Sequence, residues 1–253
     1  MAFNPKYTHL FFDLDNTLWD FDFNAKVAMK ETLANIKLEN QIEDFDRFYD
    51  DYDRINSQLW EAYRNRQIKK SDLITKRFSD TLKAYQIRGV DPIAMNELYL
   101  DLMGQQTKLV DGARPVLEEL HKRNFRLQII TNGFRDVQHR KLVNSGIAHL
   151  FQQVFCSEEV QFAKPDPRIF SHAIRSSNAK KQKSIMIGDN WEIDIIGART
   201  FGIDQVFLKT NTIPDTPPTK NTPMPVDFDN STTNTTLQQT FCVEKLTNIL
   251  LIV

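Results

Sequence analysis

Cysteine and long apolar runs are scarce in this sequence, and each scarcity argues against a class of protein. The only cysteines are Cys156 and Cys242, which are too few for a disulfide framework and fit a reducing compartment. Neither cysteine has a neighbour at the spacing of a metal site. The longest apolar run covers residues 249–253 and is far too short to span a bilayer.

The sequence also lacks an excess of charge of either sign. The 253 residues carry 32 Lys and Arg against 33 Asp and Glu, which gives a formal net charge of -1. This balance provides no electrostatic attraction to a nucleic acid polymer or a membrane surface, so neither is expected as a partner. Residues 1–6 do not form a basic segment followed by an apolar stretch. No secretory signal is therefore expected, and we predict a cytoplasmic protein.

Glycine is absent from residue 1 to residue 88, and the segment that follows the first strand carries apolar residues at helical spacing. Four apolar stripes recur, within residues 25–36, 45–63, 74–85 and 94–102. No strand-like run interrupts them. The pattern predicts a helical insertion of about eighty residues between the first strand and the next one.

The rest of the chain alternates between short strands and helices. Residues 9–18 open with an apolar run that predicts a strand buried on both faces. Strands are also predicted at residues 125–130, 154–156, 184–187 and 205–208, and helices at residues 113–123, 135–145, 167–177 and 192–201. This alternation predicts an α/β fold with a doubly wound, mainly parallel, Rossmann-like sheet.

The end of the chain breaks the alternation. Residues 211–236 are rich in Thr, Pro and Asn, which predicts a long surface loop. A last strand is expected at residues 241–243 and a closing helix at residues 244–251. Within the alternating part, Asp166 is expected to cap the helix that starts at Pro167.

Asp13 and Asp15 follow the first strand. Strand side chains alternate between faces, so the two carboxylates are expected to point the same way. Like charges this close repel each other, and the arrangement therefore needs a cation, a shared proton or both. Taken alone, the segment is equally well explained as a polar turn after a strand.

Other polar groups follow other predicted strands: Thr131 with Asn132, then Lys164, then Asp189 with the nearby Asp194. In an open parallel sheet, ligands bind in the crevice beyond the carboxyl ends of the strands. Residues that are distant in sequence are therefore expected to meet in one site.

These segments resemble the four motifs of the haloacid dehalogenase-like superfamily: residues 13–17, 131–133, 164–166 and 188–190 with Asp194. The resemblance implies a phosphatase with a core domain formed by residues 1–18 and 108–253 and a helical cap domain formed by residues 19–107. Within the phosphatase branch, the Asp-Leu-Asp-Asn-Thr-Leu-Trp-Asp start and the Ile-Thr-Asn-Gly second motif are similar to the pyrimidine 5′-nucleotidase group.

The resemblance, together with the chemistry of phosphate esters, implies roles for two of the aspartates. Asp13 is the expected nucleophile, which forms an aspartyl-phosphate. Asp15 is the expected general acid and base, because the leaving oxygen needs a proton and the attacking water must lose one. The expected cofactor is Mg²⁺. By resemblance its ligands are the Asp13 carboxylate, the Asp15 backbone carbonyl and Asp189, while Asp194 holds a metal-bound water or orients a neighbour.

The remaining motif residues are expected to bind the phosphoryl group. The Thr131 hydroxyl and the Asn132 backbone N–H can donate to phosphate oxygens, and Lys164 supplies a fixed positive charge. The cap is expected to select the substrate. Conceivable cap contacts are Trp19, Trp60, Tyr63 and Arg64, of which at least half are expected to pack inside the cap instead.

The sequence thus predicts a Mg²⁺-dependent phosphatase for a small phosphate ester, with a pyrimidine nucleoside 5′-monophosphate as the first candidate. A sugar-phosphate phosphatase or mutase would share all of these motifs. A carbon-halogen hydrolase would need neither Asp15 nor Asp189. A non-catalytic binding domain predicts that the nucleophile or a metal ligand is missing, and none is.

Overall fold

The computed structural model describes residues 5–209 and 238–253 of the chain. The loop predicted at residues 211–236 lies outside this described part. Within it, six strands form one sheet: β1 (His9–Phe12), β2 (Arg126–Thr131), β3 (Gln153–Cys156), β4 (Ser184–Gly188), β5 (Asp204–Leu208) and β6 (Thr240–Val243).

All pairs of neighbouring strands are parallel, in the order β3-β2-β1-β4-β5-β6. The chain builds outward from β1 to β3 on one side and from β4 to β6 on the other. The order therefore reverses between β1 and β4, which makes this pair the switch point where parallel sheets bind their ligands. The predicted doubly wound parallel sheet is confirmed.

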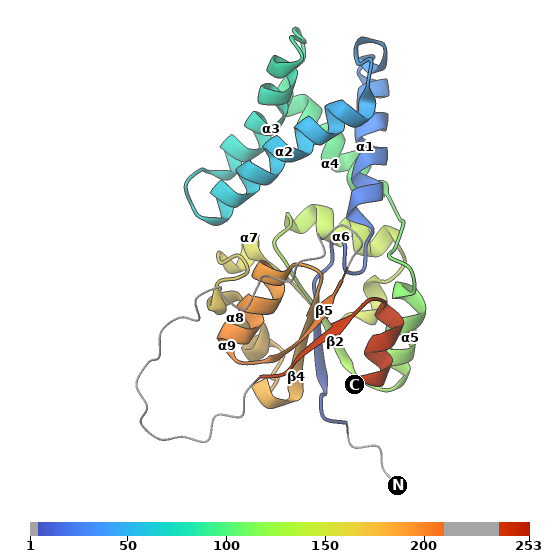
Figure 1. The fold of residues 1–253 in the computed structure, drawn as a ribbon, viewed down its shortest axis with the longest axis vertical. Coiled ribbons are helices and arrows are strands. Elements are labelled where there is room, and N and C mark those ends of the chain that lie inside the picture. The colour runs from blue at the N-terminus through green and yellow to red at the C-terminus, as the bar shows by residue number, and fades with distance from the viewer. Residues whose placement is uncertain (1–4, 210–237) are drawn as a thin grey trace.

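Helices cover both faces of the sheet (Figure 1). They are α5 (Ala113–Lys122) on one face and α8 (Pro167–Ser176) with α9 (Gly197–Phe201) on the other, while α6 (Arg135–Asn144) and α7 (Ser157–Val160) lie at the upper end of the sheet in this view. On β1, Phe11 packs with the apolar residues of α8 and α9, whereas Leu10 and Phe12 pack with those of α5 on the opposite face. Both faces of β1 are therefore buried, which explains why its sequence is a continuous apolar run.

Four helices lie between β1 and α5 in sequence: α1 (Phe21–Asn35), α2 (Phe45–Arg64), α3 (Lys70–Ala84) and α4 (Pro92–Gln105). Figure 1 shows them as a separate group beyond the sheet, on the side of α6. They enclose an aromatic cluster in which the ring centroids of Tyr52, Phe78 and Tyr99 lie 5.1–5.7 Å apart. The predicted helical insertion is thus present, and most of its aromatic residues pack against one another.

The structure corrects three local predictions. Residues 191–196 form a π-helical turn before α9, so the predicted helix 192–201 is not one regular α-helix. The closing helix predicted at 244–251 is a 3₁₀ helix, Leu246–Leu251. The short helix α7 was not predicted, because four residues carry no periodicity. Other 3₁₀ turns are Glu39–Gln41, Ala148–Leu150 and Lys181–Lys183.

Among residues 5–209 and 238–253, no helix combines the length and the apolar character that crossing a membrane requires.

Candidate active site

The loop after β1 folds tightly and fixes the first two aspartates. The backbone N–H of Asp13 donates to the Ile187 carbonyl at 2.8 Å, so the pairing of β1 with β4 continues through Asp13. The Leu14 carbonyl then accepts the N–H groups of both Leu18 and Trp19, each at 2.9 Å. This turn places Asp15 beside Asp13 at the switch point of the sheet.

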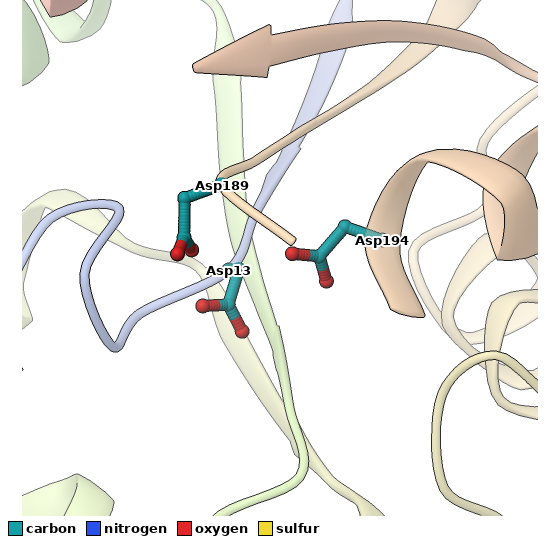
Figure 2. A group of neighbouring side chains, drawn as sticks. All are labelled: Asp13, Asp189 and Asp194. Carbon is teal, nitrogen blue, oxygen red and sulfur yellow. The ribbon is translucent and has the colours of Figure 1, made fainter. Parts of the chain in front are cut away.

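Three carboxylates gather at this point (Figure 2). Oxygens of Asp13, Asp189 and Asp194 all lie within 4.8 Å of one another. Burial is the main cause that raises the pKa of Asp13, with the neighbouring carboxylates adding to it and Lys164 opposing it. Burial and then Asp194 raise the pKa of Asp189 to about 7. Oxygen ligands with excess negative charge suit a hard divalent cation, so the cluster fits the metal that the motifs imply.

Lys164 lies inside this cluster rather than on the surface, with only 1% of its area exposed. Its Nζ is 2.5 Å from Asp13 Oδ1 and 2.7 Å from Asp194 Oδ1. Burial alone would lower the pKa of Lys164, but the two carboxylates raise it above its usual value, so the lysine stays charged. The other oxygen of Asp194 accepts the Asn190 N–H at 3.1 Å, so this carboxylate contacts both Lys164 and the turn after β4.

The Asn132 side chain holds the backbone of Lys164. Its Oδ1 accepts the Lys164 N–H at 2.8 Å, and its Nδ2 donates to the Lys164 carbonyl at 2.9 Å. Sequence reasoning expected only the Asn132 backbone N–H to matter. The side-chain contact explains how the segment that carries Lys164 is fixed against the end of β2.

The Thr131 hydroxyl oxygen accepts two hydrogen bonds, from the Gly133 N–H at 3.1 Å and from Gln138 Nε2 at 2.7 Å. A hydroxyl has two lone pairs and one proton, so its proton remains available to donate elsewhere. Thr17, another residue that the sequence did not single out as a site residue, donates its hydroxyl proton to Asp189 Oδ1 at 2.9 Å.

Helix α6 supplies two further residues that sequence reasoning missed. Lys141 Nζ lies 2.6 Å from Asp15 Oδ1, and Gln138 Nε2 donates to Asp15 Oδ2 at 2.9 Å. Burial lowers the pKa of Lys141, and Asp15 opposes that effect. One pattern in the sequence could have identified them. Phe134, Gln138 and Lys141 are separated by four and then three residues, which places all three on one helix face. Because apolar Phe134 is expected to face inward, the two polar residues are expected to face inward with it.

A cavity of about 350 Å³ opens above these groups. Its lining includes all of the predicted site residues, namely Asp13, Asp15, Thr131, Asn132, Lys164, Asp189 and Asp194. The opposite wall comes from α2 and includes Asn56, Trp60 and Arg64. Trp19 and Tyr63 do not line it. Trp19 is completely buried, and Tyr63 packs on Trp60 with ring centroids 5.8 Å apart.

The architecture defines an α/β enzyme that gathers carboxylates at the switch point of a parallel sheet. The chain belongs to the haloacid dehalogenase-like hydrolase family, whose family model matches residues 7–202. The resemblance drawn from the four motifs is therefore confirmed.

Two relatives carry the same biochemical name. The pyrimidine 5′-nucleotidase PynA of Streptococcus pneumoniae is 34% identical over 203 residues, covering 79% of this chain and 83% of that protein. The pyrimidine 5′-nucleotidase YjjG of Escherichia coli is 30% identical over 207 residues, covering 81% of this chain and 88% of that protein. With the family match, these relatives make the protein a phosphoric monoester hydrolase.

Solved structures agree on the fold. The HAD-hydrolase YfnB of Bacillus subtilis superposes with a TM-score of 0.80 at 24% identity, over 98% of this chain and 99% of that one.

Proposed function

We propose that the protein is a Mg²⁺-dependent pyrimidine 5′-nucleotidase that works through an aspartyl-phosphate. One observation carries the proposal: the cavity joins a wall of carboxylates and Lys164 to a facing wall from α2 with Asn56, Trp60 and Arg64. The first wall suits a phosphoryl group, and the second offers an amide, a ring and a guanidinium to a base and sugar. The names of PynA and YjjG point the same way.

In the proposed first step, the Asp13 carboxylate attacks phosphorus and the bond from phosphorus to the nucleoside oxygen breaks. Asp15 donates a proton to that leaving oxygen. In the second step, water attacks the aspartyl-phosphate while Asp15 takes its proton, which releases phosphate and restores Asp13. Lys164 and the Thr131 proton offset the negative charge of the phosphoryl oxygens during both steps.

The Asp13 and Asp189 carboxylates and the Asp15 backbone carbonyl are the proposed Mg²⁺ ligands. Bound there, the ion would supply positive charge to phosphate oxygens that otherwise repel the carboxylate nucleophile. The support is the donor set itself, all oxygen and rich in negative charge, and the magnesium bound in the YfnB structure.

We further propose that residues 19–107 act as a cap domain over a core formed by residues 1–18 and 108–253. The two chain segments that connect the proposed domains lie side by side and are hydrogen-bonded to each other. The Val110 N–H donates to the Leu18 carbonyl at 2.9 Å, and the Asp20 N–H donates to the Lys108 carbonyl at 3.1 Å. The cap would then carry the choice of substrate, because the core contacts only the phosphoryl group that all candidates share.

The test is a phosphate-release panel across pyrimidine and purine 5′-mononucleotides, sugar phosphates and small phosphoesters, with and without Mg²⁺. We expect UMP, dUMP and dTMP to be preferred and hydrolysis to require the metal. A sugar phosphate that is turned over faster than every nucleotide would replace the nucleotidase proposal with the sugar-phosphatase alternative. Equal rates after removal of divalent metal would reject the mechanism.

A further inference from the structure

Lys141 is a buried lysine that belongs to none of the four motifs, with 2% of its area exposed. Its only ion pair among the described residues is with Asp15. Burying a lysine costs several kcal/mol unless its charge is matched, so the site for Lys141 depends on Asp15. The dependence is mutual, since the Lys141 ammonium also fixes one oxygen of Asp15 at 2.6 Å.

Aromatic rings restrict where the Lys141 ammonium can go. Its Nζ lies 4.1 Å from the centroid of the Trp19 ring and 5.3 Å from that of Phe21. Both rings attract the cation through their faces, and Trp19 is itself completely buried. The ammonium is thus held between the rings and the carboxylate, which leaves it little freedom to release Asp15.

Gln138 ties Asp15 to the phosphate side of the site. Its Nε2 has two protons, and they go to Asp15 Oδ2 at 2.9 Å and to Thr131 Oγ1 at 2.7 Å. The hydrogen bond from Gln138 to Thr131 requires a glycine at position 133, because a Cβ there would lie 2.4 Å from Gln138 Nε2. One buried amide therefore sets the direction of two proposed functional groups.

We infer that Gln138 and Lys141 are positioning residues: they orient the Asp15 carboxylate for proton transfer to the leaving oxygen, and Gln138 also keeps the Thr131 proton directed at the phosphoryl group. The inference rests on the proposed function, in which Asp15 is the general acid and base. Neither α6 residue lines the cavity. Each acts through a group that does.

The leaving group separates this role from a purely structural one. An alkyl phosphate such as UMP must receive a proton on its leaving oxygen, whereas 4-nitrophenolate leaves without one. The leaving group departs before the aspartyl-phosphate is hydrolysed, so kcat/KM reports this departure without the later step in which Asp15 acts as base. Loss of correct Asp15 placement should therefore lower kcat/KM for UMP much more than for 4-nitrophenyl phosphate. A general loss of folding would slow both equally.

The experiment measures kcat and KM for UMP and 4-nitrophenyl phosphate in Lys141→Met, Gln138→Met, Asp15→Asn and Lys122→Met. Lys122 is exposed on α5 and serves as the matched control. We expect Lys141→Met to lower kcat/KM for UMP roughly 10- to 100-fold and kcat/KM for the aryl ester less than threefold. Gln138→Met should show the same difference between the two substrates and should also raise KM for both, because Thr131 loses its partner. Lys122→Met should match the wild type.

A double variant tests whether Lys141 acts through Asp15. In the Asp15→Asn background, Lys141→Met should cause no further loss with UMP. An equal loss on both substrates, an additive loss in the double variant, or no loss at all would overturn the inference. If Lys141→Met does not fold, which its thermal unfolding would reveal, Gln138→Met decides, since it removes no buried charge.

Failure of the proposed function gives a different result. If Asp15→Asn itself lowers kcat/KM equally for both substrates, Asp15 is not the leaving-group acid, and both proposals fall. If Asp15→Asn is selective for UMP and the α6 variants are not, only the positioning role is rejected.

Discussion

Three carboxylates and one lysine meet at the switch point, and their charges do not balance. Asp13 and Asp194 share the single charge of Lys164, while Asp189 has only the Thr17 hydroxyl among these contacts. Burial, and after it the neighbouring carboxylates, raise the pKa values of Asp13 and Asp189. A phosphate ester is itself an anion, so it would be repelled unless a cation enters first.

Asp13→Asn tests the nucleophile. An amide cannot form the aspartyl-phosphate, and we expect a loss of at least ~10³-fold in kcat. The fold should persist, because Lys164 keeps Asp194 as its partner and one source of repulsion is removed. Phosphate release and thermal unfolding check both statements. Retention of a tenth of the wild-type rate would remove Asp13 from the nucleophile role.

Gly188→Ala tests how closely the site is packed. A Cβ at Gly188 would lie 2.4 Å from Asp194 Oδ2, so Asp194 must shift and carry Lys164 with it. We expect kcat to fall at least ~10-fold, because the charge of Lys164 leaves its place. The control is Gly89→Ala, where φ is +79° and nothing lies within 4 Å of the added Cβ. That change should cost about 1 kcal/mol of stability through backbone strain and leave kcat unchanged.

If Gly188→Ala kept full activity, Asp194 would not be needed to hold Lys164.

Strand ends explain which site residues the sequence could predict. Asp13, Thr131 and Asp189 each follow an apolar run, and parallel topology brings such positions together without further information. Gln138 and Lys141 come from a helix, where polar residues usually face solvent. Their inward direction depends on how α6 packs beside the end of β1, and that packing is tertiary.

At the scale of elements, the regular strands and helices followed from local pattern, and the exceptions are short or irregular. Strands β1 and β4 are entirely buried and carry apolar runs, and β2 is buried from Leu127 onward with Gln128 as a polar residue inside it. The π-helical turn at residues 191–196 could not be predicted from apolar spacing. In it, the Asp194 side chain accepts a hydrogen bond from the Asn190 N–H. This side-chain hydrogen bond accompanies the departure from a regular helix there.

Helix α8 provides a prediction at this scale. Its N-cap is Asp166, as the sequence predicted, and the carboxylate accepts the Arg168 N–H at 2.9 Å. Asp166→Ala should lower the free energy of unfolding by about 1 kcal/mol at pH 7, whereas Asp166→Asn should lose less. Urea unfolding of the three proteins measures the difference.

The same cap has a pH dependence. The Arg168 side chain is the main cause that holds the pKa of Asp166 below its usual value. A lowered pKa in the folded state means that the stabilisation is present above about pH 4 and is lost as the pH falls. The gap between wild type and Asp166→Ala should therefore narrow from pH 7 towards about pH 3.5. A gap that stays constant would show that the charge of Asp166 contributes nothing.

At the scale of the whole molecule, one wall of the cavity comes from the inserted helices α1–α4. These helices contact the part of the molecule that carries the sheet at a few places. Lys70 of α3 pairs with Glu158 at 2.5 Å, and Arg66 donates to the Gln161 carbonyl at 2.9 Å. Trp60 packs on Phe134 with ring centroids 5.0 Å apart. Exposed ion pairs of this kind contribute little. The helical group is held over the site by the aromatic contact, by the two chain segments beside Trp19, and by α6, whose Arg140 and Asn144 donate to the Leu100 and Gly104 carbonyls of α4 at 3.1 and 2.8 Å.

Metal binding should be visible in the stability of the whole protein. The carboxylates of Asp13, Asp189 and Asp194 converge only in the folded chain, so Mg²⁺ that binds there stabilises the native state and not the unfolded one. At a hundredfold excess over the dissociation constant the gain is about 2.7 kcal/mol, which corresponds to a rise of about 5–10 °C in Tm for a chain of this size. Thermal unfolding with a Mg²⁺ titration measures it.

Two variants make this measurement specific. Asp189→Asn removes a proposed ligand and should abolish the Mg²⁺ response. It should also raise Tm in the metal-free state, because it removes a buried charge and its repulsion by Asp194, the two causes that raise the pKa of Asp189. Asp53→Asn removes an acid from the α2 wall of the same cavity and should keep the full response. An equal Mg²⁺ response in the wild type and in Asp189→Asn would mean that the ion binds elsewhere, and the acidic cluster would then need another explanation.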